Sequence, residues 1–265
     1  MFQFNYVKAK SLADAAALMQ ANPEAKLMSG GMTLLPTLKQ GLAQPSHLVD
    51  IGGLSELAGI EIKGDTLVIG AATRHYDVTS SAVVKKAIPA LAYLAHQIGD
   101  PQVRNRGTIG GSVANNDPAA DYPSACLALG ATITTNKRAI KADDFFKGMF
   151  ETALEEGEII TSISFPVPEK ANYQKFRNPA SRYALVGVFV AKTGGHVRVA
   201  VTGAGASGVF RVADFETALE GNFAPAALDG KSVSASGLNS DIHADAEYRA
   251  HLITVMAKRA VAAAG

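Results

Sequence analysis

The stretch from Asn105 to Asp121 constrains this chain most, because it reads NRGTIGGSVANNDPAAD and combines three glycines with small hydroxyl side chains. Gly107, Gly110 and Gly111 let the backbone turn sharply and approach a ligand closely, since glycine has no Cβ and tolerates positive φ. Successive amide N–H groups in such a turn can bind an anion. The stretch therefore predicts a phosphate-binding loop, with a plain connection between two strands as the alternative.

A second stretch, from Leu27 to Leu35, reads LMSGGMTLL and repeats this design: a short apolar run, two glycines and then a hydroxyl. Two such loops predict two sides of one binding site. Neither stretch has the Gly-Lys-Ser/Thr ending that phosphate-binding loops of nucleotide hydrolases carry. Their glycines also lack the G-x-G-x-x-G spacing of a dinucleotide fold, which argues against a doubly wound nicotinamide domain.

The composition excludes several classes of partner. The 265 residues suffice for one large or two to three small domains, at roughly 100–200 residues per domain. Lys and Arg number 25 against 24 Asp and Glu, so a polyanionic partner such as nucleic acid is not expected. The chain begins without a secretory apolar run and has no apolar stretch of membrane-spanning length, which predicts a soluble, cytoplasmic protein.

The metal-binding residue types are sparse. Cys126 is the single cysteine, so the chain cannot form an internal disulfide or supply the four ligands of an iron–sulfur cluster or structural zinc site. The apolar spacing around it, PSACLALG, favours a buried helix and a core cysteine over a nucleophile. None of the six histidines forms a pair at the spacing of helix-borne ligands. We therefore expect no metal on this chain, and any cluster must lie on a partner.

Periodicity, caps and turn residues predict the order of the elements. Helices are expected after a Ser11 cap, at 34–40, from an Asp77 cap into 84–88, from Pro89 to His96, from Pro123 to before Gly130, briefly at 143–146, at 213–219 and at 248–263. Strands are expected at 25–29, 47–51, 67–71, 131–135 and 158–167. A change of pattern follows Tyr173, where strands at 173–177, 184–192 and 196–202 are antiparallel and Gly194-Gly195 forms a hairpin turn.

Three longer segments match a known family. They are SGGMTLLPTLKQGLAQPSHLVDI at 29–51, RNRGTIGGSVANNDPAADYPSACLALGA at 104–131 and KFRNPASRY at 175–183. The chain resembles, nearly end to end, the FAD-binding medium subunit of molybdenum hydroxylases, the family of carbon monoxide dehydrogenase and xanthine dehydrogenase-like flavoprotein subunits. The resemblance implies an α+β fold of the vanillyl-alcohol-oxidase (PCMH) type. We expect FAD-binding subdomains at 1–56 and 57–170 and a C-terminal sheet-and-helix domain at 171–265.

The resemblance also implies the cofactor site. Both glycine loops are expected to wrap the FAD pyrophosphate, with Ser29, Gly30, Gly31, Met32, Thr33, Leu34, Thr108, Ile109, Gly110, Gly111 and Ser112. Asp121 matches a ribityl- or ring-side carboxylate, and Lys175 a flavin-contacting lysine that would favour the reduced cofactor. Ile160 and Tyr183 match residues beside the ring. Without the family, Asp121 would be expected to cap the helix at Pro123, Lys175 to be a surface lysine, and Ile160 and Tyr183 to be core residues.

The implied function is electron transfer, with no catalytic acid or base expected on this chain. In the resembling enzymes a large subunit holds the molybdenum cofactor, a small subunit holds two [2Fe-2S] clusters, and the flavin subunit passes electrons to the final acceptor. A dimer of heterotrimers is expected. A free-standing FAD-dependent oxidoreductase of the same fold is the alternative. The substrate of the complex, and quinone, NAD or oxygen as acceptor, stay open.

Overall fold

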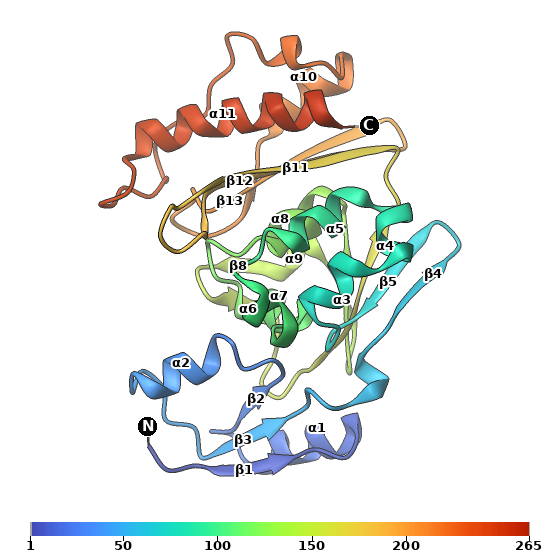
Figure 1. The fold of residues 1–265 in the computed structure, drawn as a ribbon, viewed down its shortest axis with the longest axis vertical. Coiled ribbons are helices and arrows are strands. Elements are labelled where there is room, and N and C mark those ends of the chain that lie inside the picture. Colours follow the sequence, from blue (N-terminus) through green and yellow to red (C-terminus); the bar gives the residue numbers. More distant parts are fainter. Residues whose placement is uncertain (1, 265) are drawn as a thin grey trace.

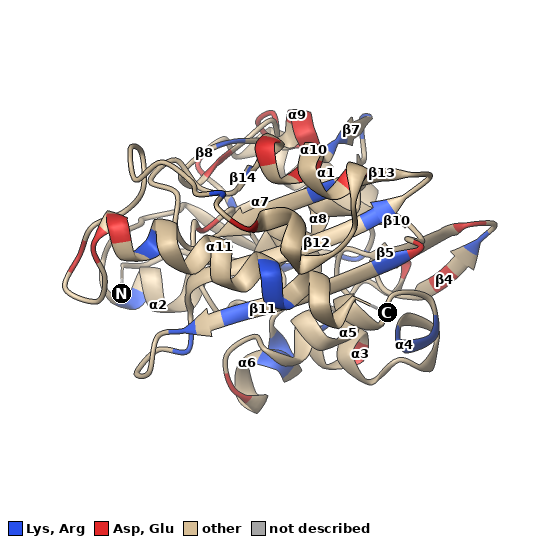
Figure 2. Cartoon of the chain, turned by 90° about the horizontal axis from the view of Figure 1, so that it is seen from above, with Lys and Arg blue, Asp and Glu red and all other residues tan. Residues whose placement is uncertain are grey.

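Three sheets of three to five strands lie one after another along the length of the molecule, in sequence order, with helices packed between and around them (Figure 1). Residues 146–148 and 151–152 pair as a separate two-stranded sheet. The computed structural model describes residues 2–264. Figure 2 colours the ribbon by residue type and shows Lys and Arg positions and Asp and Glu positions scattered over many elements. Within the described residues no helix is both long and apolar enough to cross a membrane. The chain is thus a mixed helix-and-sheet protein.

The N-terminal sheet has three parallel strands in the order β1-β3-β2, with Leu48 and Val49 of the central strand fully buried. Ser11 caps the first helix, because its side chain accepts a hydrogen bond from the Asp14 amide at 3.1 Å, as predicted. The first two strands in the sequence are each followed by a helix that leads to the next strand of this sheet. The elements are β1 (Asn5–Lys8), α1 (Leu12–Ala21), β2 (Lys26–Met28), α2 (Leu34–Lys39) and β3 (His47–Asp50).

The middle sheet is antiparallel, in the order β4-β5-β10-β6-β7, and helices cover it on the side that faces the C-terminal sheet (Figure 1). A short 3₁₀ helix at Ser55–Leu57 leads into it. Its elements are β4 (Ile60–Lys63), β5 (Thr66–Gly70), α3 (His75–Ser80), α4 (Ala82–Ala87), α5 (Pro89–His96), α6 (Pro101–Arg106), α7 (Ile109–Asn115), α8 (Tyr122–Ala128), β6 (Thr132–Thr135), β7 (Ala139–Lys141), α9 (Ala142–Phe145), β8 (Phe146–Gly148), β9 (Glu151–Thr152) and β10 (Ile160–Pro166).

Two expectations for this middle region are corrected. The predicted Asp77 cap is wrong, because Asp77 lies inside α3 and Ser81 caps α4 by accepting from the Val84 amide. The predicted phosphate loop is largely a helix, α7, whose capping residue is Thr108. The Cys126 prediction is confirmed: the residue is fully buried in α8, and burial raises the pKa of its thiol, so it stays neutral.

The C-terminal sheet has the antiparallel order β11-β12-β13-β14 and is covered on both faces. Valines 186, 188 and 190 of β12 pack towards α10 and α11, whereas Phe189 packs with the helices of the middle region, including α8. The elements are β11 (Lys170–Arg177), β12 (Ala184–Thr193), β13 (His196–Thr202), β14 (Phe210–Arg211), α10 (Ala213–Gly221), a 3₁₀ helix at Pro225–Leu228 and α11 (Ala246–Ala263). The predicted hairpin is confirmed, with Gly194 and Gly195 both at positive φ.

Candidate functional site

A cleft of about 990 Å³ is lined by residues from all three sheet regions. This volume is at the upper end of the range, roughly 300–1,000 Å³, that small-molecule and cofactor pockets occupy. Most of the sequence-predicted site residues lie along it: Ser29, Gly30, Gly31, Met32, Thr33, Leu34, Thr108, Gly110, Gly111, Ser112, Asp121, Ile160, Lys175 and Tyr183. The fold therefore gathers segments that are up to about 150 residues apart into one cavity, as the two glycine loops had predicted.

The first glycine loop follows β2 and leads into α2. Gly31 has a φ of 72°, and a Cβ on Gly30 would clash with the carbonyl group of Arg106. No hydrogen bond within residues 2–264 uses the amide N–H groups of Gly30, Gly31, Met32 or Thr33. Buried or cleft-facing amides are normally paired. These four adjacent amides are therefore available to a ligand, and they are suited to an anion.

The second loop differs from its prediction. Its amides bond within the protein: Ile109 N–H donates to the Thr73 carbonyl at 3.0 Å and Gly110 N–H to the Ala71 carbonyl at 2.9 Å. Gly111 N–H donates to the Thr108 hydroxyl at 3.2 Å. The expected anion-binding arrangement of these three amides is therefore wrong, because two of them donate to backbone carbonyls after β5 and the third donates to the Thr108 hydroxyl.

Two residues of this loop have other roles than expected. Ile109 is fully buried in the core of the middle region and is not part of the cleft wall. A Cβ on Gly110 would lie 2.5 Å from the Ala71 Cβ and 2.7 Å from the Ala71 oxygen. Gly110 is thus required for close packing of α7 on the end of β5, and it also lines the cleft.

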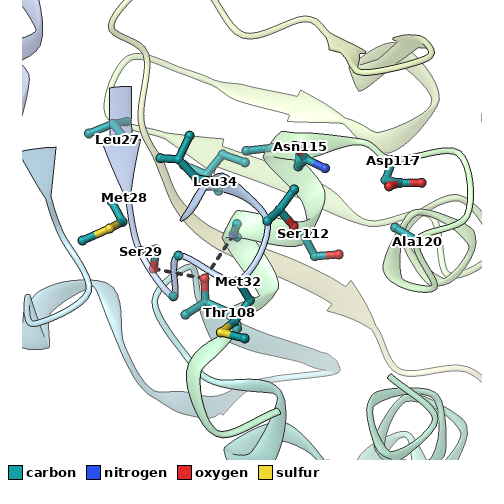
Figure 3. Close-up of a pocket in the computed structure, with 18 of the residues that line it drawn as sticks. Leu27, Met28, Ser29, Met32, Leu34, Thr108, Ser112, Asn115, Asp117 and Ala120 are labelled. Carbon is teal, nitrogen blue, oxygen red and sulfur yellow. Dashed lines mark hydrogen bonds between the residues drawn. The ribbon is translucent and has the colours of Figure 1, made fainter. Parts of the chain in front are cut away.

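A pair of hydroxyl groups joins the two loops. The Thr108 hydroxyl donates to the Ser29 hydroxyl at 3.0 Å, while it also accepts from Gly111 (Figure 3). In Figure 3, Leu27, Met28 and Leu34 lie on the side of the first loop, and Ser112, Asn115 and Asp117 follow the second. This hydrogen bond holds the first loop against the N-terminus of α7.

Asp121 and Lys175 form a buried ion pair at another part of the cleft. The Lys175 ammonium donates to Asp121 Oδ2 at 2.9 Å and to the Gln97 carbonyl at 3.3 Å, and both side chains are at most 5% exposed. Tyr173 donates its hydroxyl proton to Asp121 Oδ1. Asp121 makes no side-chain cap to α8, so the capping alternative is wrong. Lys175 is likewise no surface lysine, since its side chain is only 2% exposed.

The residues expected beside the ring lie at the cleft in two different environments. Tyr183 is 52% exposed, at the end of a turn in which the Asn178 side chain accepts from the amides of Ala180 and Ser181. Partial burial raises the pKa of Tyr183, and the charges of Asp117 and Asp121 add to this effect. Ile160 is 5% exposed and belongs to the middle core as well as to the cleft wall.

Two buried polar residues of the cleft wall were missed from the sequence. Burial lowers the pKa of His75 to about 4, and the charge of Arg104 contributes. Burial by itself raises the pKa of Glu158, but hydrogen bonds from Arg138, the Glu155 amide and Thr135 outweigh it and lower the pKa to about 2. Neither residue stood out, because an isolated His or Glu carries no motif. In the described part of the chain no cluster of His, Cys, Asp and Glu could hold a metal.

Comparisons with known proteins identify the family of this chain. The family described as the FAD binding domain in molybdopterin dehydrogenase matches residues 2–168. The carbon monoxide dehydrogenase medium chain of Hydrogenophaga pseudoflava is 36% identical, with 99% of this chain and 97% of that protein covered. The nicotine 6-hydroxylase medium subunit of Paenarthrobacter nicotinovorans is 35% identical, with 98% and 96% covered.

Solved structures give the same result over the whole chain. A carbon monoxide dehydrogenase from Hydrogenophaga pseudoflava that lacks the Mo-pyranopterin moiety of its cofactor superposes with a TM-score of 0.90, at 37% identity, covering 99% of this chain and 97% of that one. Quinoline 2-oxidoreductase from Pseudomonas putida 86 gives 0.88 at 29% identity, covering 98% and 96%. The chain therefore belongs to the family of FAD-binding medium subunits of molybdenum hydroxylases, which are subunits of oxidoreductases.

Proposed function

We propose that this chain is the FAD-carrying electron-transfer subunit of a heterotrimeric molybdenum hydroxylase. It takes electrons from [2Fe-2S] clusters on a partner subunit and passes them to a terminal acceptor. The observation that carries the proposal is the row of four amides at Gly30 to Thr33 that have no partner among residues 2–264. The Ser29–Thr108 hydrogen bond holds this row at the wall of a cofactor-sized cleft.

The residues present fit FAD. A diphosphate can be bound by backbone amides and hydroxyl groups without basic side chains, and neither loop contains a lysine or arginine between 27 and 35 or between 107 and 115. A Cβ at Gly30 or Gly31 would meet neighbouring atoms, so the first loop keeps its shape only with glycine. We assign the pyrophosphate to the amides of residues 30–33 and the hydroxyls of Ser29, Thr108 and Ser112.

The remaining cleft residues would orient the rest of the cofactor. When bound, FAD can accept electrons singly and release them in pairs, which suits a junction between iron–sulfur clusters and an acceptor. Lys175 holds a positive charge at the cleft wall, Tyr183 provides an aromatic surface and Ile160 an aliphatic one. No residue needs to move a proton to a substrate, since the organic substrate would be oxidised on another subunit.

The partners we propose are a small iron–sulfur subunit and a large molybdenum subunit, assembled as a dimer of heterotrimers. Two relatives support this by being named medium chains or subunits, of carbon monoxide dehydrogenase and of nicotine 6-hydroxylase. The chain's single cysteine supports it too, because a [2Fe-2S] cluster needs four ligands. The substrate would be selected by the large subunit.

We also propose the vanillyl-alcohol-oxidase type of fold, with FAD-binding subdomains at 1–56 and 57–170 and a C-terminal domain at 171–265. The sheets support this division, because the first uses strands between residues 5 and 50, the second between 60 and 166, and the third between 170 and 211. The cleft lies where all three contribute residues.

The test is a visible absorption spectrum of the chain purified alone, followed by mass spectrometry of the released cofactor. We expect FAD at close to one equivalent, either directly or after addition of FAD and the partner subunits. Absence of FAD from the chain in all of these forms would contradict the proposal. Turnover of an organic substrate by the chain alone would favour the free-standing oxidoreductase instead.

A further inference from the structure

We propose that Tyr173 is a positioning residue for Lys175, and that it acts through Asp121 without touching the cofactor. The inference rests on the proposed function, because it assigns a role towards bound FAD. Tyr173 is fully buried and is not among the residues that line the cleft. Asp121 and Lys175 both line it.

The three side chains form a continuous chain of hydrogen bonds. Asp121 accepts from Tyr173 on Oδ1 and from Lys175 on Oδ2, so each carboxylate oxygen has a donor from β11. Tyr173 and Lys175 are two residues apart in that strand, and residues at this spacing point to the same face of a sheet. Each carboxylate oxygen of Asp121 thus accepts from a donor of the protein, and this makes Asp121 the residue that links Tyr173 to Lys175.

The surroundings of Tyr173 are built for this contact. Its ring stacks against Phe189 at a centroid distance of 6.0 Å. A Cβ on Gly187, in the middle of β12, would clash with the Tyr173 hydroxyl. Glycine in the interior of a strand weakens the strand and often marks a close approach of another group. Gly187 leaves the space through which the hydroxyl reaches Asp121.

Lys175 keeps one donor for the cleft. Its ammonium group has three protons, of which Asp121 and the Gln97 carbonyl accept two. Burial, and then the Asp121 carboxylate, raise the pKa of Tyr173 well above its ordinary value, so the hydroxyl stays a neutral donor. With Tyr173 in place, the Asp121 charge is shared between two donors, and the Lys175 charge is held where it can act on bound FAD.

The experiment compares Tyr173→Phe with Tyr122→Phe on the full chain loaded with FAD, or on the assembled complex if FAD is retained only there. Tyr122 is also fully buried, but its hydroxyl has no hydrogen-bond partner within the described residues, which makes it a matched control. The measurement is the midpoint potential of bound FAD, from a reductive titration with a reference dye. Melting temperatures of both variants establish that they fold.

We expect Tyr173→Phe to shift the midpoint potential to a more negative value, because the Asp121 charge is then less compensated and Lys175 less fixed. Tyr122→Phe should leave the potential of the unaltered protein unchanged. In an Asp121→Asn background the Tyr173→Phe change should shift the potential clearly less, since the carboxylate through which it acts is gone.

The inference would be overturned if the midpoint potential is the same in Tyr173→Phe, in Tyr122→Phe and in the unaltered protein. Tyr173 would then be an ordinary core residue, whatever its effect on the melting temperature. An equal shift with Asp or Asn at position 121 would overturn the route through Asp121. Failure of the unaltered protein to bind FAD, alone and in the complex, would overturn the proposed function together with this inference, so the two failures are distinguishable.

Discussion

The two glycine loops have similar sequences, but they perform different physical tasks. In the first, the amides of residues 30–33 have no partner within the described residues, and Gly31 adopts a left-handed φ of 72°. In the second, the amides of Ile109 and Gly110 donate to carbonyls of Ala71 and Thr73, and the glycines lie in helix α7. The first loop offers donors to a ligand, whereas the second anchors a helix against a strand end.

This difference shows that a glycine pair followed by a hydroxyl does not define one function. Gly30 must be glycine because a Cβ would clash with the Arg106 carbonyl group, and Gly31 because its φ is left-handed. Gly110 is needed because Ala71 leaves no room for a side chain. The Ser29–Thr108 hydrogen bond then makes the two loops a single wall of the cleft. The predictions below test each loop separately, from the largest expected effect to the smallest.

Gly110→Val should have the largest effect of these changes. We expect it to lower the stability of the protein even without cofactor. Its side chain would overlap Ala71, and overpacking of this kind costs about 3 kcal/mol at the upper end of its usual range. Urea denaturation of the FAD-free protein measures the free energy of unfolding. Gly221→Val in α10 is the control, because a Cβ there meets no atom within 4 Å. If the two variants are equally stable and only Gly110→Val loses FAD binding, position 110 is glycine to let the ligand approach the backbone, and not to pack against Ala71.

Acid should weaken the packing beneath the second loop through His75. A Cβ on Gly107 would lie 2.6 Å from its Nε2, and the folded-state pKa of His75 is about 4, because it is buried. The folded pKa of His75 lies below the unfolded value near 6.5, so the unfolded state binds the proton first as pH falls. The stability that depends on neutral His75 is therefore complete above pH 6.5 and is lost as pH falls towards 4. The loss is on the order of 2–3 kcal/mol at pH 4.5.

The measurement is the unfolding free energy of the protein and of His75→Gln from pH 7.5 to 4.5. The variant should lose this part of the pH dependence, although it is less stable at neutral pH. Parallel curves for the two proteins over this range would contradict the assignment of the acid sensitivity to His75.

Gly31→Ala should weaken FAD binding through the first loop. The left-handed φ of Gly31 costs an alanine about 1–2 kcal/mol, and a shift of the loop would misdirect the free amides. Loss of one charge-assisted hydrogen bond corresponds to roughly a tenfold higher dissociation constant for FAD. Gly64→Ala, at a φ of 59° in the open β4–β5 turn, is the control. Both should lose similar stability, and only Gly31→Ala should lose affinity in a fluorescence titration.

Thr108→Val should have the smallest effect, and it tests the link between the loops. It removes the cap to Gly111 and the donor to Ser29, which corresponds to about 1 kcal/mol of unfolding free energy. Thr217→Val is the control, because Thr217 is exposed and its hydroxyl donates only to the Ala213 carbonyl within α10. It should change stability by less than about 0.5 kcal/mol. If both variants behave alike in denaturation and FAD titration, the hydroxyl pair does not hold the loops together.

Most regular elements followed from local signals in the sequence. The Ser11 cap, Pro89 and the Gly194-Gly195 turn each place an element that the structure contains, because their effects act within a few residues. The short elements β1, β4 and α6 were missed, although Asp100 before Pro101 is a capping signal for the last of these. Helix α7 was not predicted either, because Ala71 and Thr73 fix its start from more than 30 residues away.

The sequence by itself determined the two glycine segments, their hydroxyls, the lack of ligands for a cluster and the family, because each depends on residue types and their local order. Only the tertiary structure decided which amides stay free and what Asp121 does. Its partners Tyr173 and Lys175 come from a strand more than 50 residues later. Asp121 is only 5% exposed, and a buried carboxylate needs partners within the protein, so the packing, and not the local sequence, selects its hydrogen bonds.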